Sequence, residues 1–237
     1  MRLLLSVLWR LLLVGGILVV IAVPVAVLHP ESPLPVEWNP TRPLDVSAPL
    51  TPVSKLQLRR ALNDGATCRA VLAEHGVQFQ QKADLETSDT CHIRDRILLQ
   101  SVGGARVSPL ETRCDLALRL AMWEQHGIRP VAEEYGVEVT RLYHQGSYNC
   151  RKMRTRRGQS ERWSEHAVAG AIDIRAFGLS DGRQIALLKH WDGPHAPFLR
   201  ALWQSSCDWF NLVLSPEYNA LHADHLHLQA SGWGFCR

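Results

Sequence analysis

The segment Leu11–Leu28 constrains this chain most, because its 18 successive residues carry no charge and are almost all apolar. That length is near the lower limit of about 17–25 residues for a helix that spans a bilayer. Arg2 and Arg10 precede the segment, and His29 and Glu31 follow it. By the positive-inside rule, this asymmetry places the N-terminus in the cytoplasm and the rest of the chain across the membrane.

A cleavable signal peptide is the alternative interpretation of residues 1–29. The apolar core of a signal peptide is usually about 7–15 residues long and is followed by small residues such as Ala-x-Ala. Here the segment ends Val-Pro-Val-Ala-Val-Leu-His, which is a poor cleavage site. We therefore expect residues 1–29 to be an uncleaved, single-pass anchor in the inner membrane. Under either interpretation the remainder is exported, and we expect it in the periplasm.

A proline-rich segment follows the anchor at residues 30–53. Its prolines favour an extended, polyproline-like spacer between the membrane and a folded domain at 54–237; they are Pro30, Pro33, Pro35, Pro40, Pro43, Pro49 and Pro52.

The composition is that of an ordinary globular protein, with 46% hydrophobic and 21% charged residues among 237. One domain is expected after the first fifty residues or so. The net charge of +3 gives no reason to expect nucleic-acid binding. A local basic run either is a solvated loop or attracts an anionic polymer or a substrate carboxylate; it consists of Arg151, Lys152, Arg154, Arg156, Arg157 and Arg162.

Six cysteines are spread over the exported part without a Cys-x-x-Cys pair. In an oxidising compartment an even number favours three disulfides over buried free thiols. Of the about 15 possible pairings, closeness in sequence favours Cys68 with Cys91, and the other pairings stay open.

Hydrophobic periodicity predicts an α+β domain with helices mostly early and strands mostly late. The strongest helix is expected at 109–126, with Ser108 as N-cap, Pro109 at the first position and Gly127 at the end. Further helices are predicted at 54–62, 66–75, 130–135 and 197–210. Strands are predicted at 137–143, 171–177, 211–214 and 224–229.

Two motifs carry the residues that favour a metal site, namely Ser-Glu-His-Ala-Val-Ala-Gly-Ala-Ile-Asp-Ile at 164–174 and His-Ala-Asp-His-Leu-His at 222–227. His166, Asp173 and His227 supply two imidazoles and a carboxylate, which suits a catalytic Zn²⁺ with one position left for water. Ser164 and His222 are candidates for groups that orient these ligands.

A general base must take a proton from the attacking water, and Asp224 is the first candidate. Because strand residues three apart point to opposite faces, Asp224 reaches the site of His227 only from the turn that enters the strand. His225 shares a face with His227 and is the alternative base. Arg151 is placed to stabilise negative charge on a cleaved carbonyl.

The motifs Ser164-x-His166…Ala171-x-Asp173-Ile and Asp224-His225-x-His227 resemble the zinc signature of the D-alanyl-D-alanine metallopeptidases and of the related Hedgehog domains. Closer likeness is to the bacterial extensin-like C-terminal domain family. It rests on Gly-Ser-Tyr-x-Cys-Arg at 146–151, Ser-Glu-His-Ala at 164–167, Asp-Gly at 181–182 and the 222–227 motif, and it spans about residues 55–237 with all six cysteines.

The resemblance implies a Hedgehog/DD-peptidase-like fold in which a small antiparallel sheet lines the site. It also implies zinc on His166, Asp173 and His227, with Asp224 as base and Arg151 at the transition state. The peptidases usually have glycine three residues after the first histidine, where this chain has Ala169. Because of this departure, we expect the turn at Ala169 and the fit of the substrate to differ slightly from those of the peptidases.

Two functions are therefore expected as alternatives. The first is a zinc peptidase of the DD- or LD-carboxypeptidase or endopeptidase kind, which hydrolyses amide bonds in peptidoglycan. The second is a non-catalytic, zinc-containing module that binds the cell wall or a partner through the basic run, since fold alone does not establish activity.

Overall fold

The computed structural model describes the chain except Met1, Pro30 and Arg157, and it divides into two units, residues 1–61 and 62–237. Arg157 of the basic run and Pro30 of the proline-rich segment therefore lie outside the described residues. Helix α2 (Pro52–Asn63) contains the boundary between the two units.

The first unit begins with helix α1 (Arg2–Leu28). Its segment Val7–Leu28 has a mean hydropathy of 3.0 over the most apolar window, so α1 is long and apolar enough to cross a membrane or to act as a signal sequence. The described residues 31–51 form a short 3₁₀ helix η1 (Val36–Trp38) and a series of turns.

Side-chain hydrogen bonds close these turns. The buried Asn39 Nδ2 donates to His29 O at 2.8 Å, and Gln57 Nε2 of α2 donates to Val36 O at 2.9 Å and to Asn39 O at 3.0 Å. Each of these carbonyls also accepts a backbone N–H, so the side chains reinforce turns that the backbone closes. The extended spacer predicted for this segment is therefore wrong, because the segment turns back on α2.

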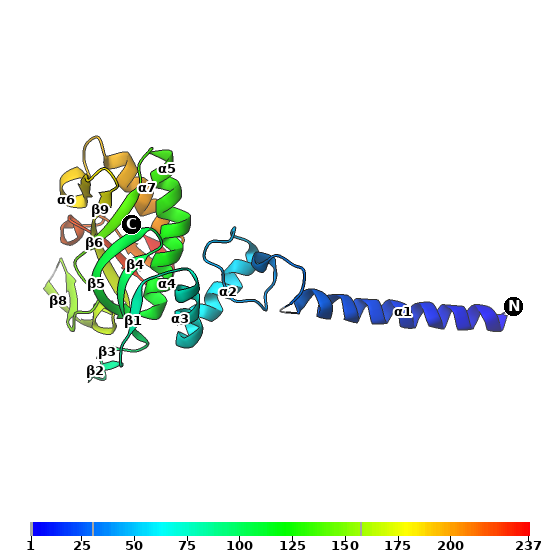
Figure 1. Cartoon of the computed structure of the whole chain (residues 1–237). Coiled ribbons are helices and arrows are strands. Elements are labelled where there is room, and N and C mark those ends of the chain that lie inside the picture. Colours follow the sequence, from blue (N-terminus) through cyan, green and yellow to red (C-terminus); the bar gives the residue numbers. More distant parts are fainter. Residues whose placement is uncertain (1, 30, 157) are drawn as a thin grey trace. The chain divides into compact units, whose positions relative to one another are not determined.

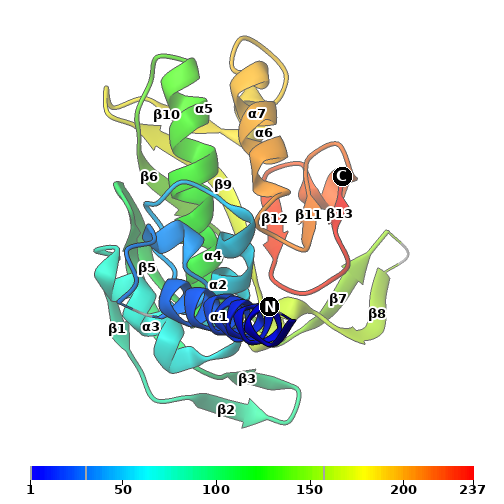
Figure 2. The ribbon, with the colours of Figure 1, turned by 90° about the vertical axis from the view of Figure 1, so that its right-hand side faces the viewer.

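The second unit is built on one mixed sheet, which confirms the α+β class (Figures 1 and 2). Its strand order is β1-β4-β5-β6-β9-β12-β11-β13, with β10 paired to β9. The strands are β1 (Phe79–Gln81), β4 (Arg96–Val102), β5 (Ala105–Arg113), β6 (Val139–His144), β9 (Ala171–Leu179), β10 (Gln184–Ala186), β11 (Leu212–Leu214), β12 (Leu226–Gln229) and β13 (Phe235–Cys236). Neighbouring strands are antiparallel except β5–β6 and β11–β13.

Two small hairpins lie outside the main sheet, β2–β3 (Leu85–Ser88, Cys91–Ile93) and β7–β8 (Lys152–Thr155, Gly158–Trp163). Strands β1 to β5 and the β7–β8 hairpin have no counterpart among the predicted strands. The prediction that strands come mostly late therefore missed the group β1 to β5, which precedes α4.

Helices α4 (Cys114–Trp123), α5 (Arg129–Glu134) and α7 (Ala196–Ser206) lie on one face of the sheet (Figures 1 and 2). Other helices of this unit are α3 (Gly65–Glu74), α6 (Leu187–His190), η3 (Glu165–Val168) and η4 (Ala220–His222). The helices predicted at 54–62, 66–75, 130–135 and 197–210 correspond to α2, α3, α5 and α7, although α7 ends four residues early.

Strand β5 replaces the first part of the helix predicted at 109–126. Residues Leu110–Arg113 pair with β4, and the register shifts so that Pro109, which has no N–H to donate, lies outside the paired positions. Tertiary pairing thus overrides the capping pattern, and the helix starts at Cys114.

The helix also does not end at Gly127, because a π-helical turn η2 (Glu124–Ile128) joins α4 to α5. A Cβ on Gly127 would lie 2.5 Å from Cδ1 of Trp123, so the missing side chain makes room for that ring. The fully buried Trp123 meets Phe177 of β9 edge-on at 6.1 Å and donates through Nε1 to Ser205 of α7. It thereby ties α4 to the sheet and to α7.

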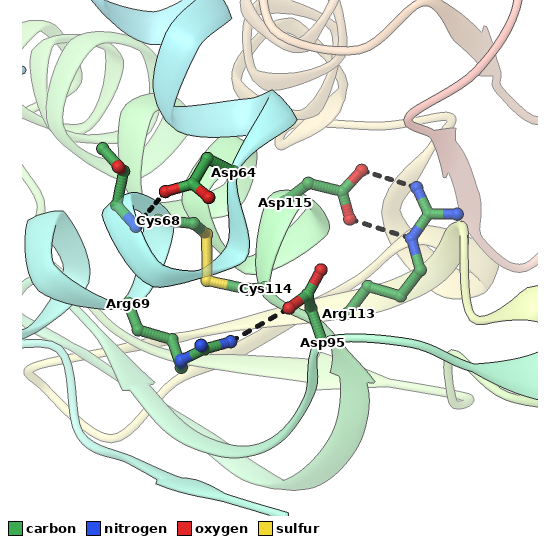
Figure 3. The surroundings of a disulfide bond; sticks show 8 residues. Asp64, Cys68, Arg69, Asp95, Arg113, Cys114 and Asp115 are labelled. Atoms are coloured by element: carbon green, nitrogen blue, oxygen red, sulfur yellow. Dashed lines mark hydrogen bonds and ion pairs between the residues drawn. A yellow bond between two sulfur atoms is a disulfide. The ribbon is translucent and has the colours of Figure 1, made fainter. Parts of the chain in front are cut away.

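All six cysteines form disulfides, which confirms three bridges and excludes free thiols: Cys68–Cys114, Cys91–Cys150 and Cys207–Cys236. The predicted pair Cys68–Cys91 is wrong, because Cys68 on α3 faces the start of α4 (Figure 3). Near this bridge, Asp64 caps α3 by accepting from Thr67 N at 2.7 Å, and the Arg113–Asp115 ion pair flanks it on α4 (Figure 3).

We predict that removing the Cys68–Cys114 bridge by the double substitution Cys68→Ala and Cys114→Ala lowers the free energy of unfolding by about 4 kcal/mol. The reason is that the bridge closes a chain segment with a sequence separation of 46 and so restricts the unfolded state. Urea unfolding of the full chain in detergent, followed by tryptophan fluorescence, measures the loss. A change below about 1 kcal/mol would contradict this role.

Candidate metal centre

Strand pairing brings the two halves of the candidate site together. Strand β12 is antiparallel to β9 in a register that places His227 directly opposite Asp173. Directly opposite residues of a pair have side chains on the same face, about 5 Å apart at Cβ. The His227 ring accordingly donates from Nδ1 to Asp173 Oδ1 at 2.8 Å.

His166 comes to the same place from η3. The Ser164 side chain caps this turn by accepting from His166 N at 3.3 Å, so Ser164 shapes the turn from its N-terminal end. At the other end, Ala169 adopts φ +49° and ψ +31°, the left-handed region that favours glycine. The alanine that departs from the peptidase pattern therefore holds the conformation for which glycine is suited.

A buried hydrogen-bond network fixes the His166 ring. Its Nδ1 donates to Ser147 O at 2.7 Å, which leaves Nε2 directed at Asp173. The Ser147 hydroxyl bonds Thr112 Oγ1 at 2.9 Å and donates to Ala169 O at 3.3 Å. Ser147 and Thr112 were not among the predicted site residues, and single buried hydroxyls give no sequence signal for such a role.

His166, Asp173 and His227 together have the geometry of a metal site. One candidate ligand atom from each lies within 4.8 Å of the others. His166 Nε2 is 3.2 Å from Asp173 Oδ2 and 3.3 Å from His227 Nδ1. Ligand atoms about 2.0–2.1 Å from a tetrahedral zinc are about 3.3 Å apart, so the donor set and its spacing fit zinc.

Asp173 is held as a carboxylate in this cluster. Burial alone would raise its pKa, but hydrogen bonds from His166 and His227 and the charge of these rings hold the pKa well below its usual range. The side chain therefore offers a negative oxygen ligand, which a divalent cation requires.

Asp224 and His225 form a pair beside the cluster. Asp224 lies in the turn before β12, which is the position from which it was expected to approach the site. Its Oδ1 accepts from His225 Nδ1 at 2.7 Å, and its Oδ2 accepts from Gln145 Nε2 at 2.8 Å. Burial raises the pKa of Asp224, but these two hydrogen bonds outweigh it and lower the pKa. Both oxygens of Asp224 are thus engaged, and His225 Nε2 points to Asp173 Oδ1 at 3.5 Å.

His222 lies on the outer side of this pair in η4. Its ring centroid is 5.2 Å from that of His225 and 5.9 Å from that of His227, and Nδ1 contacts Asn219 Oδ1 at 2.9 Å. Burial, followed by repulsion from His225 and His227, lowers the pKa of His222 to about 4. The ring is therefore neutral near pH 7 and packs against the other imidazoles without adding charge.

Arg151 lies next to Cys150, whose bridge to Cys91 anchors this segment to β3. Burial and repulsion from Arg154 lower the pKa of Arg151, while attraction to Asp173 opposes the shift. Arg151 and Asp173 line the same pocket.

That pocket has a volume of about 1230 Å³ and contains Asp173, Asp224, His225 and His227. Most described residues of the basic run belong to the β7–β8 hairpin, namely Lys152, Arg154, Arg156 and Arg162. This hairpin lies beside the β11–β13 end of the sheet (Figure 2) and supplies much of the pocket lining. The structure thus brings every predicted site residue to one region, and it adds Gln145, Trp163 and Trp233 to the pocket, which sequence reasoning missed.

We predict that the full chain binds one Zn²⁺ and that His166→Ala abolishes this binding, because the substitution removes one of the three candidate ligands. Zinc at about 1000 times its Kd should stabilise the wild-type fold by about 4 kcal/mol. Metal analysis after dialysis and the thermal midpoint with and without zinc measure both effects. His195→Ala is the matched control, because His195 pairs with His190 away from this pocket. Equal zinc content in wild type and His166→Ala would contradict the assignment.

Comparison with known proteins gives one family. The model of the extensin-like protein C-terminus matches residues 66–237, which is most of the chain and contains both site motifs. No curated protein and no solved structure matches the chain. The chain therefore belongs to the extensin-like protein C-terminal family.

Proposed function

We propose that this protein is an exported, membrane-anchored zinc peptidase that hydrolyses amide bonds in peptidoglycan peptides, with a domain related to the D-alanyl-D-alanine metallopeptidases and Hedgehog domains. The observation that carries the proposal is the close grouping of His166, Asp173 and His227 beside the Asp224–His225 pair. A purely structural metal site has no use for an oriented acid–base pair in an open pocket.

The three ligands would leave one coordination position open, so zinc bound there would supply an acidified water and polarise the substrate carbonyl. His225 Nε2 faces the cluster, and Asp224 holds its ring through Nδ1. We assign proton acceptance from the water to His225, with Asp224 as the residue that orients it. His225 then returns the proton to the leaving amine.

Asp224 itself as base is the alternative within this mechanism. It is disfavoured because hydrogen bonds occupy both carboxylate oxygens and lower its pKa. Arg151, which interacts with the Asp173 charge from the pocket wall, would stabilise the negative oxygen that develops at the cleaved carbonyl. His222 and Ser164 complete the surroundings of the ligands.

The location proposed for the enzyme follows from α1. A helix of this length and hydropathy can serve as a single-pass anchor in the inner membrane. The arginines before it would remain in the cytoplasm, and the domain would lie in the periplasm beside the wall. Three disulfides are in keeping with an oxidising compartment.

The competing function is a non-catalytic module that binds wall material. It is favoured by the exposed basic hairpin, which is suited to anionic polymers. The two functions differ in whether anything is released from the wall.

Isolated peptidoglycan incubated with the full chain in detergent should release muropeptides, and a chelator should stop the release. Chromatography of the soluble fraction measures it. His166→Ala should lose both zinc and release, whereas His195→Ala should retain both. Zinc-loaded protein that binds peptidoglycan but releases nothing would establish the binding module and contradict the peptidase.

We further predict that Asp224→Asn and His225→Ala each lower kcat at least about 100-fold while zinc content is retained, because neither is a ligand. The double variant should be little worse than His225→Ala, since the two residues act as one unit. If Asp224 acts alone as base, His225→Ala should instead be mild. Metal analysis of each variant is the control for loss of the site.

A further inference from the structure

The β7–β8 hairpin forms one wall of the pocket that contains the metal cluster. Arg154 and Arg162 line this wall together with Trp163 at the end of β8. Tyr218, which follows β11, and Trp233, which precedes β13, line the same pocket. The hairpin is therefore part of the surface that any substrate of the cluster meets.

Two arginines of this wall, Arg154 and Arg162, have no partner of opposite charge among the described residues. Among the described residues, no carboxylate lies within 4.0 Å of the guanidinium of Arg154 or Arg162, whereas Lys152 on the same hairpin pairs with Glu161. Both arginine side chains are exposed, so each can bind an incoming anion without first breaking an ion pair.

The hairpin is also held in position over the pocket. Arg156, close to its tip, donates from Nη2 to Tyr218 O at 3.0 Å and so connects the two walls. At its base, Ser164 N donates to Arg151 O at 3.1 Å, next to the Cys91–Cys150 bridge. Arg154 and Arg162 lie between these two attachments, which restrict the wall and so reduce the entropy lost on binding.

Like charges crowd on this wall while it is empty. Arg154 repels the partly buried Arg151, and this repulsion adds to burial in lowering the pKa of Arg151. A negative group placed between these side chains would relieve the repulsion, as is typical of anion-binding sites.

Aromatic side chains beside the arginines indicate more than a bare inorganic anion. Trp163 is 43% exposed and Trp233 is 87% exposed, and both line the pocket. Such rings cover apolar stems and stack on planar amides or guanidinium groups. The ligand that suits this wall is an organic chain that carries acid groups.

We propose that Arg154 and Arg162 form a carboxylate-binding subsite next to the metal cluster, and that the substrate is accordingly a peptide chain with free carboxylates beside the bond that is cleaved. The subsite specifies the substrate of the proposed peptidase, and the inference that this substrate is cleaved rests on that proposed function. Its binding role can be tested without any turnover.

The test uses the full chain in nanodiscs of neutral phosphatidylcholine. A chelator is present so that the sacculi are not hydrolysed during the binding measurement. Binding to peptidoglycan sacculi is measured by sedimentation, with untreated sacculi and with sacculi whose carboxylates have been converted to amides. The double substitution Arg154→Gln and Arg162→Gln should weaken binding to untreated sacculi about tenfold. The wild type should lose a similar factor on amidated sacculi, where the variant should lose nothing more.

The matched control is Arg106→Gln with Arg175→Gln. Both arginines are exposed and lie outside this pocket, and replacing them removes the same charge as the test substitutions. This variant should bind like the wild type. If the wild type binds both kinds of sacculi equally, or if the Arg154 and Arg162 variant binds like the wild type, the subsite is wrong even if peptidoglycan is hydrolysed. If these results hold but no muropeptide is ever released, the peptidase is wrong and the subsite stands.

Discussion

The register between β9 and β12 is the constraint on which the candidate site depends. It places His227 opposite Asp173, and it brings His225, two positions earlier, to the same side of the sheet. A shift of one residue would turn both histidines to the opposite face, since side chains alternate along a strand. The cluster therefore forms completely in one register and not at all in the neighbouring one. The buried Asp173 carboxylate reinforces this register, because hydrogen bonds from the imidazoles of His166 and His227 compensate its burial.

The rest of the domain holds this strand pair and brings the remaining groups to it. Trp123 packs edge-on against Phe177 of β9 and so connects the helical face of the sheet to the strand that carries Asp173. On the other side, the left-handed turn at Ala169 and the Ser147 carbonyl set the position and ring orientation of His166. The Cys91–Cys150 bridge fixes the backbone beside Arg151. The candidate ligands, the Asp224–His225 pair and Arg151 thus come from separate segments, and separate contacts hold these segments in position.

Much of the site was predictable because its residues lie in two short motifs whose spacing reflects strand geometry. His225 and His227 share a face through the period of two, and Asp224 lies in the turn, as that period required. Features that depend on distant partners were not predictable. Leu110–Arg113 carry a helix-start pattern, yet pairing with β4 makes them a strand. Cys68 is close to Cys91 in sequence, but the packing of α3 on α4 brings it to Cys114. The sequence of the basic run did not predict a hairpin beside the candidate metal site. Its charges indicate exposure to solvent, but they do not indicate which segments pack against it.

The edge of the sheet nearest the site is completed by a segment far along the chain. Strand β13 pairs in parallel with β11 through Phe235 and Cys236, Ser215 N donates to Arg237 O at 2.7 Å, and Cys236 is bridged to Cys207. Strand β11 in turn borders β12, which carries His227. Without Phe235 and Cys236, β11 would present an open edge that is prone to pairing with other chains. The strand that closes this edge is therefore held by a covalent link to Cys207, directly after α7, as well as by its backbone hydrogen bonds.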